Sequence, residues 1–326
     1  MLEFLVKVMI NPQQPLNSHQ HVGILLLAFG GPRSLDEVEP FLNNIFSGHP
    51  LTPSLIDQVR TRYQRIGGKS PLLEITERQA RSLENHLRKG GHRIDVHIGM
   101  RHWHPYIHES LKAMAEKGMK KVLCLIMSPY SSRATAKGYH DAVHEAIMDL
   151  EKEMGAYFAS SWHTHPLYLE AVTKTVEEGL AQFPPHRQRY VPIIFSAHGL
   201  PENLVRNDPY VDHINATISG IMERFKGNTW YLAFQSRGRG KGKWLSPAIE
   251  EGLEIVAQSG MKEVLITPLS FVADHLETLY DLDLVLREKA EALGLQFQRA
   301  SALNDHPKFI EALTDIVSKS IDQKLS

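Results

Sequence analysis

The chain has 326 residues, of which 42% are hydrophobic and 22% are charged, and its formal net charge is −1. This length suits two domains or one large α/β domain, and the balanced charge gives no reason to expect a nucleic-acid partner. The single cysteine, Cys124, excludes an intrachain disulfide and any cluster held by cysteines alone.

The start of the chain does not read as a membrane anchor. No apolar run reaches the roughly 18 to 20 residues that a helix needs to cross a bilayer. The first ten residues, MLEFLVKVMI, include Glu3 and Lys7 and lack a small-residue cleavage site. We expect residues 1–21 to form a flexible lead-in and the protein to be cytoplasmic, while peripheral membrane contact and the choice between monomer and homodimer stay open.

Apolar, β-rich runs alternate with helical patterns along the first half of the chain. Residues 22–29 (VGILLLAF) predict a buried strand, and residues 34–46 predict a helix that begins with a capping box of Ser34 and Glu37. The alternation continues with a helix at 74–91, a strand at 93–100, a helix at 104–118, a strand at 120–130 and a helix at 134–150.

The same alternation resumes after a crossing helix predicted at 166–183. Strands are expected at 191–197, 229–236 and 262–271, and helices at 215–225, 246–260 and 275–294. Strands separated by helices are typical of parallel sheets built from βαβ units. The sequence therefore predicts two similar Rossmann-like α/β domains, at 22–165 and 166–326, with parallel sheets flanked by helices and a ligand cleft between them.

Two repeated motifs support this division into halves. GILLLAFGGP near the start of the chain resembles VPIIFSAHGLP at 191–201, and residues 118–130 resemble residues 260–272. Each motif ends a predicted strand, and ligands of open parallel sheets lie beyond the carboxyl ends of the strands. A site between the two halves is the natural expectation.

The repeats differ in chemistry at equivalent positions. His198 in the second half corresponds to Phe29 in the first, while His275 and Glu277 correspond to Arg133 and Thr135. The second half would therefore present imidazole and carboxylate groups, which bind metals and transfer protons.

Purely structural explanations exist for each of these residues. His198 could be a turn residue, Asp274 and Glu277 could cap a helix, and Glu277 with Asp281 could form a solvated helix face. On a regular helix His275 and Glu277 point in different directions, so they converge only at a helix start or on a widened turn. Because the candidate groups follow equivalent strand ends, we favour a site.

Other motifs carry less information. GGKS at 67–70 lacks the leading glycine of a phosphate loop, because Tyr63 stands there. The basic, glycine-rich run at 236–244 (SRGRGKGKW) is typical of a solvated loop. Trp244 at its end is expected either to pack in the core or to contact a flat ligand.

Five motifs together resemble ferrochelatase, the family of enzymes that insert ferrous iron into a porphyrin in haem synthesis. The motifs, over roughly residues 22–320, are FSAHGLP, QSRGRGKGKWLSP, FVADHLETLYDLD, IGGKSPL and GMRHWHP. The resemblance implies two Rossmann-like halves around a porphyrin cleft. It also implies ferrous iron as a substrate, no permanently bound cofactor and, since this chain lacks the cysteine-bound tail of the animal members, no iron–sulfur cluster.

The resemblance assigns roles to individual residues. His198 and Glu277 match the catalytic, metal-site pair of the family, and His275 and Asp281 match a helix of histidine and acids that runs from it. The acid expected four residues further on is replaced by Val285, which puts a second cation site in doubt. The family's porphyrin contacts match Phe29, Arg62, Tyr63, Ser70, Arg101, His102 and Tyr139. Trp244, which the sequence offers for contact with a flat ligand, is added to this substrate-binding set.

The implied reaction exchanges two pyrrole protons for a metal ion, and the sequence does not decide whether His198 or Glu277 takes the protons. Phe29 and Phe46 stand where the coproporphyrin branch of the family tends to have tyrosine and arginine, which favours protoporphyrin IX. Two alternatives remain, namely another tetrapyrrole metal chelatase and a non-catalytic porphyrin- or haem-binding protein.

Overall fold

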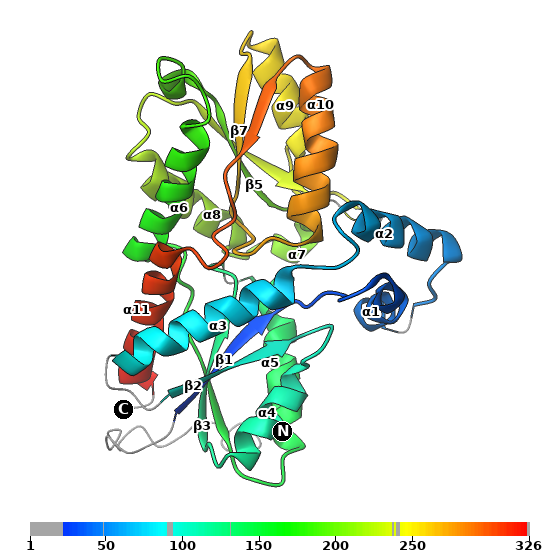
Figure 1. The fold of residues 1–326 in the computed structure, drawn as a ribbon, viewed down its shortest axis with the longest axis vertical. Coiled ribbons are helices and arrows are strands. Elements are labelled where there is room, and N and C mark those ends of the chain that lie inside the picture. Colours follow the sequence, from blue (N-terminus) through cyan, green and yellow to red (C-terminus); the bar gives the residue numbers. More distant parts are fainter. Residues whose placement is uncertain are drawn as a thin grey trace.

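The computed structural model describes residues 22–47, 49–89, 94–130, 132–236, 238 and 242–324. The lead-in predicted at 1–21 lies outside the described residues. The chain forms two α/β halves that stand one above the other, with a small helical lobe projecting from the side where they meet (Figure 1).

Each half contains a four-stranded sheet in which every pair of neighbouring strands is parallel. The N-terminal sheet has the order β2-β1-β3-β4, and the C-terminal sheet has the order β6-β5-β7-β8. The strands are β1 (Val22–Ala28), β2 (Ile94–Met100), β3 (Lys121–Ile126), β4 (Gly155–Phe158), β5 (Ile193–His198), β6 (Trp230–Gln235), β7 (Glu263–Pro268) and β8 (Gln296–Arg299). The order is the same in both halves, which confirms the predicted fold class.

Backbone hydrogen bonds at the strand ends confirm the predicted alignment of the repeats. Met127 N donates to Leu27 O at 2.9 Å in the N-terminal half, and Leu269 N donates to Ser196 O at 2.8 Å in the C-terminal half. Each bond ties the end of the third strand in its half to the end of the first. Counting two residues on from Leu27 and Ser196 makes Phe29 and His198 structurally equivalent.

One face of each sheet packs into a common core that joins the halves. This core contains Leu26 of β1 and Phe195 of β5, together with side chains of α3 (Leu72–Lys89), α6 (Pro166–Leu180), α8 (Tyr210–Met222) and α11 (Pro307–Lys324). Leu25 and Leu27 alternate with Leu26 and point to the opposite face of the sheet. Strands that bury both faces read as continuous apolar runs, which explains the run at 22–28.

Further helices cover the outer faces of the sheets. The N-terminal sheet packs against α4 (Ile107–Glu116) and α5 (Arg133–Met148), and the C-terminal sheet packs against α9 (Ile249–Gln258), the π-helix η4 (Glu277–Leu286) and α10 (Arg287–Ala292). Short helical segments occur at η3 (Gln188–Tyr190) and α7 (Glu202–Val205).

The last helix returns to the first half of the chain. α11 lies beside α6 and α3 (Figure 1), and Lys324 Nζ donates to the carbonyl of Phe158 at 2.7 Å. The C-terminal segment therefore packs on both halves. The boundary predicted at 165/166 divides the sequence, but it does not separate two units that pack independently.

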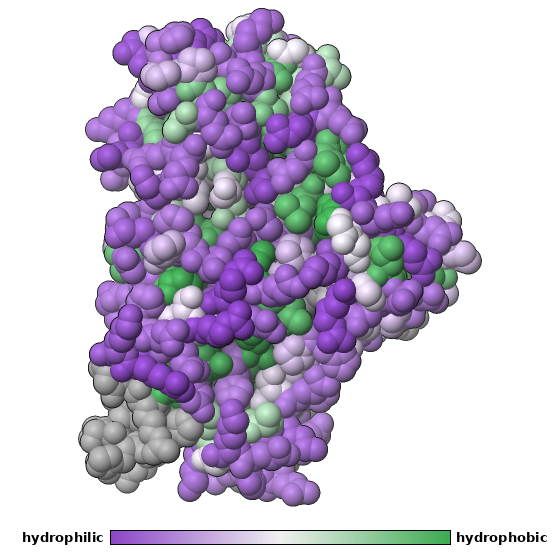
Figure 2. Space-filling view, in the orientation of Figure 1, coloured by the Kyte–Doolittle hydropathy of each residue, from purple (hydrophilic) through white to green (hydrophobic). Residues whose placement is uncertain are grey.

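The side lobe consists of η2 (Leu35–Glu37), α1 (Val38–Ile45) and α2 (Pro53–Arg65). Its small core includes Leu42 and Tyr63 and reaches Leu276, immediately before η4. In Figure 2 the largely hydrophilic surface is interrupted by apolar side chains where this lobe meets the upper half. The lobe thus connects the N-terminal half to the helix that carries Glu277.

The capping box predicted at Ser34 and Glu37 is wrong. The Ser34 side chain makes no capping hydrogen bond. The Glu37 carboxylate instead accepts from Arg33 N and Trp103 Nε1, both at 2.7 Å. The Arg33 guanidinium also donates to this carboxylate, so Glu37 is not available to cap the helix start. The Arg33 contact has a local i,i+4 spacing, whereas the Trp103 contact comes from a distant part of the chain.

Among the described residues, no helix combines the length and the apolar character that a membrane span requires.

Candidate active site

The centre of the candidate site is a pair formed by the last residue of β5 and the first residue of η4. His198 Nδ1 lies 3.0 Å from Glu277 Oε2, and their side chains are 31% and 30% exposed. Within the described part of the chain, the other ring nitrogen of His198, Nε2, makes no hydrogen bond. A carboxylate thus orients the imidazole while one nitrogen remains available to a ligand.

The π-helix explains how Glu277 reaches His198. Glu277 is the first residue of the π-helix, so it lies both at a helix start and on a widened turn, the two arrangements that the sequence left open. π-Helical turns are rare and often occur at functional sites. The helix-capping interpretation of Glu277 is wrong, because its carboxylate bonds to His198; Asp274 instead accepts the hydroxyl of Thr278 at 3.0 Å.

The electrostatics of the pair follow from its partial burial. Burial favours the neutral acid, but the positive charge and hydrogen bond of His198 outweigh it and hold the pKa of Glu277 at about 2. Burial likewise lowers the pKa of His198, and the Glu277 carboxylate more than compensates, so the pKa of this imidazole is raised. Near neutral pH, Glu277 is therefore ionised and His198 has increased proton affinity.

The backbone around the pair is fixed by residues that the sequence analysis did not select. His198 N donates to Ser270 Oγ at 3.0 Å, and the Tyr210 hydroxyl donates to His198 O at 3.0 Å. Gln235 Nε2 donates to Glu277 O at 3.2 Å, and the Gln235 side chain also accepts from the Ser196 hydroxyl. Gln235 and Ser270 lie at or just beyond the ends of strands. That position is the one feature of the sequence that could have identified them as site residues.

Asp281 lies further along η4 and has a different environment. Ser236 Oγ donates to Asp281 Oδ2 at 2.9 Å, and Arg62 Nη1 lies 4.0 Å from Asp281 Oδ1. Burial is the largest influence and raises the pKa of Asp281, with the nearby Glu277 charge acting in the same direction. Ser236 has a left-handed φ of 58°, a strained conformation of the kind that clusters at functional sites.

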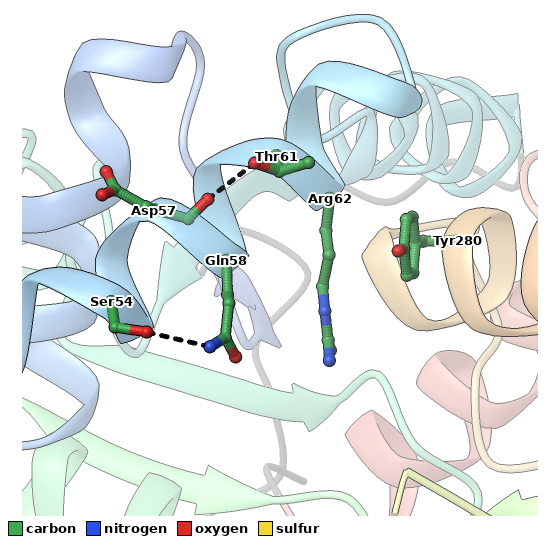
Figure 3. Close-up of a pocket in the computed structure, with 6 residues that line it drawn as sticks. All are labelled: Ser54, Asp57, Gln58, Thr61, Arg62 and Tyr280. Atoms are coloured by element: carbon green, nitrogen blue, oxygen red, sulfur yellow. Dashed lines mark hydrogen bonds between the residues drawn. The ribbon is translucent and has the colours of Figure 1, made fainter.

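An open groove lies beside this acid, between α2 and η4. It has a volume of about 640 Å³ and is lined by Ser54, Asp57, Gln58, Thr61, Arg62 and Tyr280. Arg62 extends from α2 in front of the Tyr280 ring (Figure 3), with its guanidinium carbon 5.4 Å from the ring centroid. The groove leads to the Arg62–Asp281 contact and does not include His198 or Glu277.

Tyr63 and Ser70 connect the side lobe to the turn after β1. A side chain at Gly31 would lie 2.6 Å from Ser70 Oγ and 4.0 Å from the Tyr63 hydroxyl, so the turn passes directly over both residues. Both side chains are buried. Burial and the charge of Glu277 raise the pKa of Tyr63, which places this phenol within electrostatic reach of the pair.

Phe29 and His102 form the aromatic part of the N-terminal half. Their ring centroids are 4.5 Å apart, and 44% of Phe29 is exposed. Burial, together with the neighbouring Arg101 charge, lowers the pKa of His102 to about 4. This surface is therefore apolar and uncharged at neutral pH.

Arg101 and Tyr139 form a second group on this half. The guanidinium carbon of Arg101 lies 5.7 Å from the Tyr139 ring centroid. The guanidinium also lies against Gly138, where any Cβ would be 2.0 Å from it. No contact joins this group to His198 or Glu277 within the described ranges.

The two remaining predicted residues lie beside the loop that follows β5 and beside the helix start. Trp244 forms an isolated bridge with Pro201, three residues after His198, and is partly exposed. The ring of His275 lies 4.3 Å from that of Phe271, which in turn lies 5.9 Å from His198. Burial lowers the pKa of His275, while Glu277 opposes this shift.

The described residues contain no cluster of three or more histidine, cysteine or acidic side chains arranged to hold a metal ion. At this site the ligand-type groups in direct contact are the pair His198 and Glu277. An imidazole and a carboxylate suit ferrous iron, and together they can also accept protons.

Comparisons with known proteins agree on one family. The family model for ferrochelatase matches residues 21–321. The ferrochelatase of Geotalea uraniireducens is 37% identical over 323 residues, covering 94% of this chain and 99% of the relative. The ferrochelatase of Geobacter metallireducens is 39% identical over 319 residues, covering 92% of this chain and 99% of the relative.

Solved structures extend the comparison to the fold alone. SirB from Bacillus subtilis with Fe3+ has a TM-score of 0.53 at 11% identity and covers 92% of this chain and 96% of its own. CbiX, described as the terminal enzyme for siroheme biosynthesis in denitrifying bacteria, also has a TM-score of 0.53 at 11% identity and covers 91% of this chain and 98% of its own.

Proposed function

This chain belongs to the ferrochelatase family, whose reaction is the insertion of ferrous iron into a porphyrin to give haem, and we propose that protoporphyrin IX is the porphyrin it uses. We also propose that His198 and Glu277 are its catalytic and metal-binding residues. The 3.0 Å contact that joins them at the end of β5 is the observation that carries this assignment.

The reaction requires both a cation site and a proton acceptor. The porphyrin loses two pyrrole protons, Fe²⁺ enters between the four nitrogens, and the metal keeps its oxidation state. Glu277 has a pKa of about 2, so it presents a negative charge to the cation at every working pH. His198 contributes an imidazole whose Nε2 is available and whose proton affinity is raised by that carboxylate.

Asp281 complements Glu277 because burial shifts its pKa upwards. When the pKa values of two neighbouring carboxyl groups differ, one group stays charged and the other can carry a proton. Here Glu277 would be the charged group and Asp281 the proton carrier. We propose that Asp281 receives protons released near Glu277 and passes them towards the open groove at Arg62. His275 lies beside the same route.

The facing wall would hold the macrocycle through the Phe29 ring, which has no atom that can coordinate the metal. Phe29 offers an exposed ring, and the neighbouring His102, with a pKa of about 4, remains neutral. Apolar contact across the ring orients it over the His198–Glu277 pair and excludes water from the reacting nitrogens. Tyr63, Ser70, Arg101, Tyr139 and Trp244 are proposed to complete the porphyrin contacts.

The preference for protoporphyrin IX is supported by two exposed apolar side chains. Phe29 and Phe46 are 44% and 41% exposed, at positions where a tyrosine and an arginine would be expected for a substrate with more carboxylates. Burying either ring against vinyl and methyl groups is favourable, whereas a propionate there would lose hydration without gaining a charged partner.

Iron is proposed to be a substrate, with no resident cofactor. An iron–sulfur cluster is bound by several thiolates, and the chain has one cysteine. Cys124 is buried in β3, where burial raises the pKa of its thiol. Cytoplasmic location, peripheral membrane contact and the monomeric or dimeric state remain expectations from the sequence.

The test is metal insertion measured side by side with two porphyrins. The purified full chain would be mixed anaerobically with Fe²⁺ and either protoporphyrin IX or coproporphyrin III, and haem formation followed by absorbance. We expect faster insertion with protoporphyrin IX. Faster insertion with coproporphyrin III would contradict the preference, and insertion into neither would contradict the function.

Two variants separate an enzyme from a carrier. His198→Ala and Glu277→Gln should each lower kcat by about 100-fold or more while porphyrin binding, followed by fluorescence quenching, stays within a few-fold of wild type. His186→Ala, at an exposed histidine remote in sequence from every site residue, is the matched control and should retain full activity. A wild-type chain that binds porphyrin without turnover would be a porphyrin-binding protein.

A further inference from the structure

Arg299, the last residue of β8, joins two acids on either side of Glu277. Its Nε and Nη2 donate to the two carboxylate oxygens of Asp283 at 2.6 and 2.7 Å. Its Nη1 lies 3.2 Å from Asp274 Oδ1. Only 10% of the Arg299 side chain is exposed, so this cluster of one cation and two anions is largely shielded from water.

The two acids bracket the segment that carries the proposed metal site. Asp274 lies three residues before the start of η4, and Asp283 lies within η4, so Glu277 and Asp281 fall between them. A bidentate guanidinium–carboxylate contact fixes both distance and orientation. Arg299 therefore sets where the two ends of this segment lie relative to each other.

The geometry of the segment needs such a constraint. π-Helices usually persist for only a single turn, whereas η4 spans ten residues from Glu277 to Leu286. Each residue of an α-helix advances 100°, and each residue of the wider helix advances less. Relaxation of η4 to an α-helix would rotate Asp283 about the axis relative to Asp274, and one guanidinium could no longer hold both acids.

Neighbouring contacts anchor the same cluster to the rest of the fold. Asp274 also accepts from Asn304 Nδ2 at 2.8 Å, and Asn304 O accepts from Gln79 of α3 at 2.7 Å. At the other end, Arg287 donates to Asp283 O and to Phe297 O of β8, both at 3.1 Å. The N-terminal half and the edge strand of the C-terminal half thus support the two ends of the segment.

We propose that Arg299 is a positioning residue for metal insertion, which keeps η4 in its wide form so that the Glu277 carboxylate meets His198. This inference rests on the proposed function of that pair. Arg299 touches neither His198 nor Glu277 and acts through Asp274 and Asp283. Its loss should therefore lower the rate of insertion and leave porphyrin affinity unchanged.

The decisive variant is Arg299→Lys, which keeps the positive charge but replaces the planar fork with a point charge. Insertion of Fe²⁺ into protoporphyrin IX should fall at least tenfold in kcat, with the KM for porphyrin within twofold of wild type. Amide hydrogen exchange of residues 276–286 should become faster, while exchange in the other helices stays as in wild type.

Arg187→Lys is the matched control. Arg187 binds Glu263 in the same two-point manner, with Nε and Nη2 contacts of 2.9 and 2.7 Å, at the opposite end of β7 from the site. It should leave kcat and the exchange of η4 unchanged. An equal loss of kcat in both variants would overturn the positioning role, since the effect would then reflect general destabilisation.

Asp283→Asn provides a second route to the same conclusion if Arg299→Lys does not fold. It should also accelerate exchange in residues 276–286 and reduce kcat, and unchanged exchange there would refute the proposal. Where Arg299→Lys does fold, the double variant should cost less than the product of the single losses. An Arg299→Lys protein with kcat within twofold of wild type, or with reduced kcat but unchanged exchange in η4, would refute the proposal. The exchange measurement needs no turnover, so absence of insertion by the wild-type chain would overturn the proposed function separately.

Discussion

Replacing Glu277 with glutamine removes the charge of the central pair while preserving its size. The ordinary pKa of this carboxyl group is 4.5 and the folded value is about 2. Since one pKa unit corresponds to about 1.4 kcal/mol, the difference is about 3 kcal/mol. The carboxylate is 30% exposed, and solvent screening reduces its contribution to roughly 2 kcal/mol.

The direction of the pH effect follows from the two shifts. The lowered pKa of Glu277 stabilises the fold above pH 4.5, and that stabilisation is lost as the pH falls from 4.5 towards 2. The raised pKa of His198 contributes fully below its unfolded value of 6.5 and is lost as the pH rises through the folded value. The pair is therefore most stabilising between pH 4.5 and pH 6.5.

The assay compares free energies of unfolding in urea at pH 6 and pH 3. More than half of the Glu277 contribution should be lost at pH 3, so wild type should lose about 1 kcal/mol more than Glu277→Gln over this interval. Glu288→Gln, at a carboxylate that is 67% exposed, is the control and should follow wild type. Equal losses in wild type and Glu277→Gln would show that His198 does not hold this carboxyl group ionised, and the reasoning would fail.

Two further predictions concern packing and a histidine pair. Gly138→Ala places a methyl group 2.0 Å from the Arg101 guanidinium, so Arg101 should move away from the Tyr139 ring. The KM for porphyrin should then rise several-fold, while kcat stays unchanged and Tm stays equal or rises. An unchanged KM would show that Arg101 does not contact the porphyrin. Burial and the stacked His213 ring hold the pKa of His163 at about 4, so the fold should lose stability as the pH falls below 6.5. His163→Gln should reduce the loss between pH 7 and pH 5 by about 1 kcal/mol after screening, measured by urea unfolding, and an unchanged loss would contradict the assignment.

The duplicated fold was predictable because its inner strands are strongly apolar. Six strands, three in each half, were expected from the sequence, and the structure contains all of them. The strands that were missed, β4 and β8, are four residues long and pair on one side only. GAYF and QFQR carry no extended apolar run, so their strand character comes from the neighbouring strand and could not be recognised locally.

Besides the short segments η3 and α7, two longer helices were missed for a related reason. α2 and α11 are amphipathic, and they bury their apolar residues against partners that are distant in sequence. α2 packs on Leu276 and α11 packs on α3 and α6. The alternation of strands and helices gives no reason to expect a further helix between the predicted helices at 34–46 and 74–91, or after the predicted helix at 275–294.

The central pair of the candidate site could be predicted from the sequence, but the residues that hold its backbone could not. Two equivalent strand ends identified His198, and Glu277 begins a π-helix, which combines the helix start and the widened turn that the sequence left open. Ser270 and Tyr210, which hold the His198 backbone, are single polar residues with no distinctive spacing. Their role depends on three chain segments that meet only in the folded protein, so a local pattern could not reveal it.

The equivalence of Phe29 and His198 bears on how a product could leave the proposed site. Both residues follow the first strand of their sheet, and matching backbone bonds fix them at the same place in each half. Of these two equivalent residues only His198 offers a ligand atom, and its imidazole is already bonded to Glu277 through Nδ1. A metalloporphyrin between the halves would meet an apolar ring on one face and at most one axial nitrogen on the other. Because Phe29 offers no ligand atom, these two positions cannot hold haem between two axial imidazoles, and this asymmetry favours release of the product.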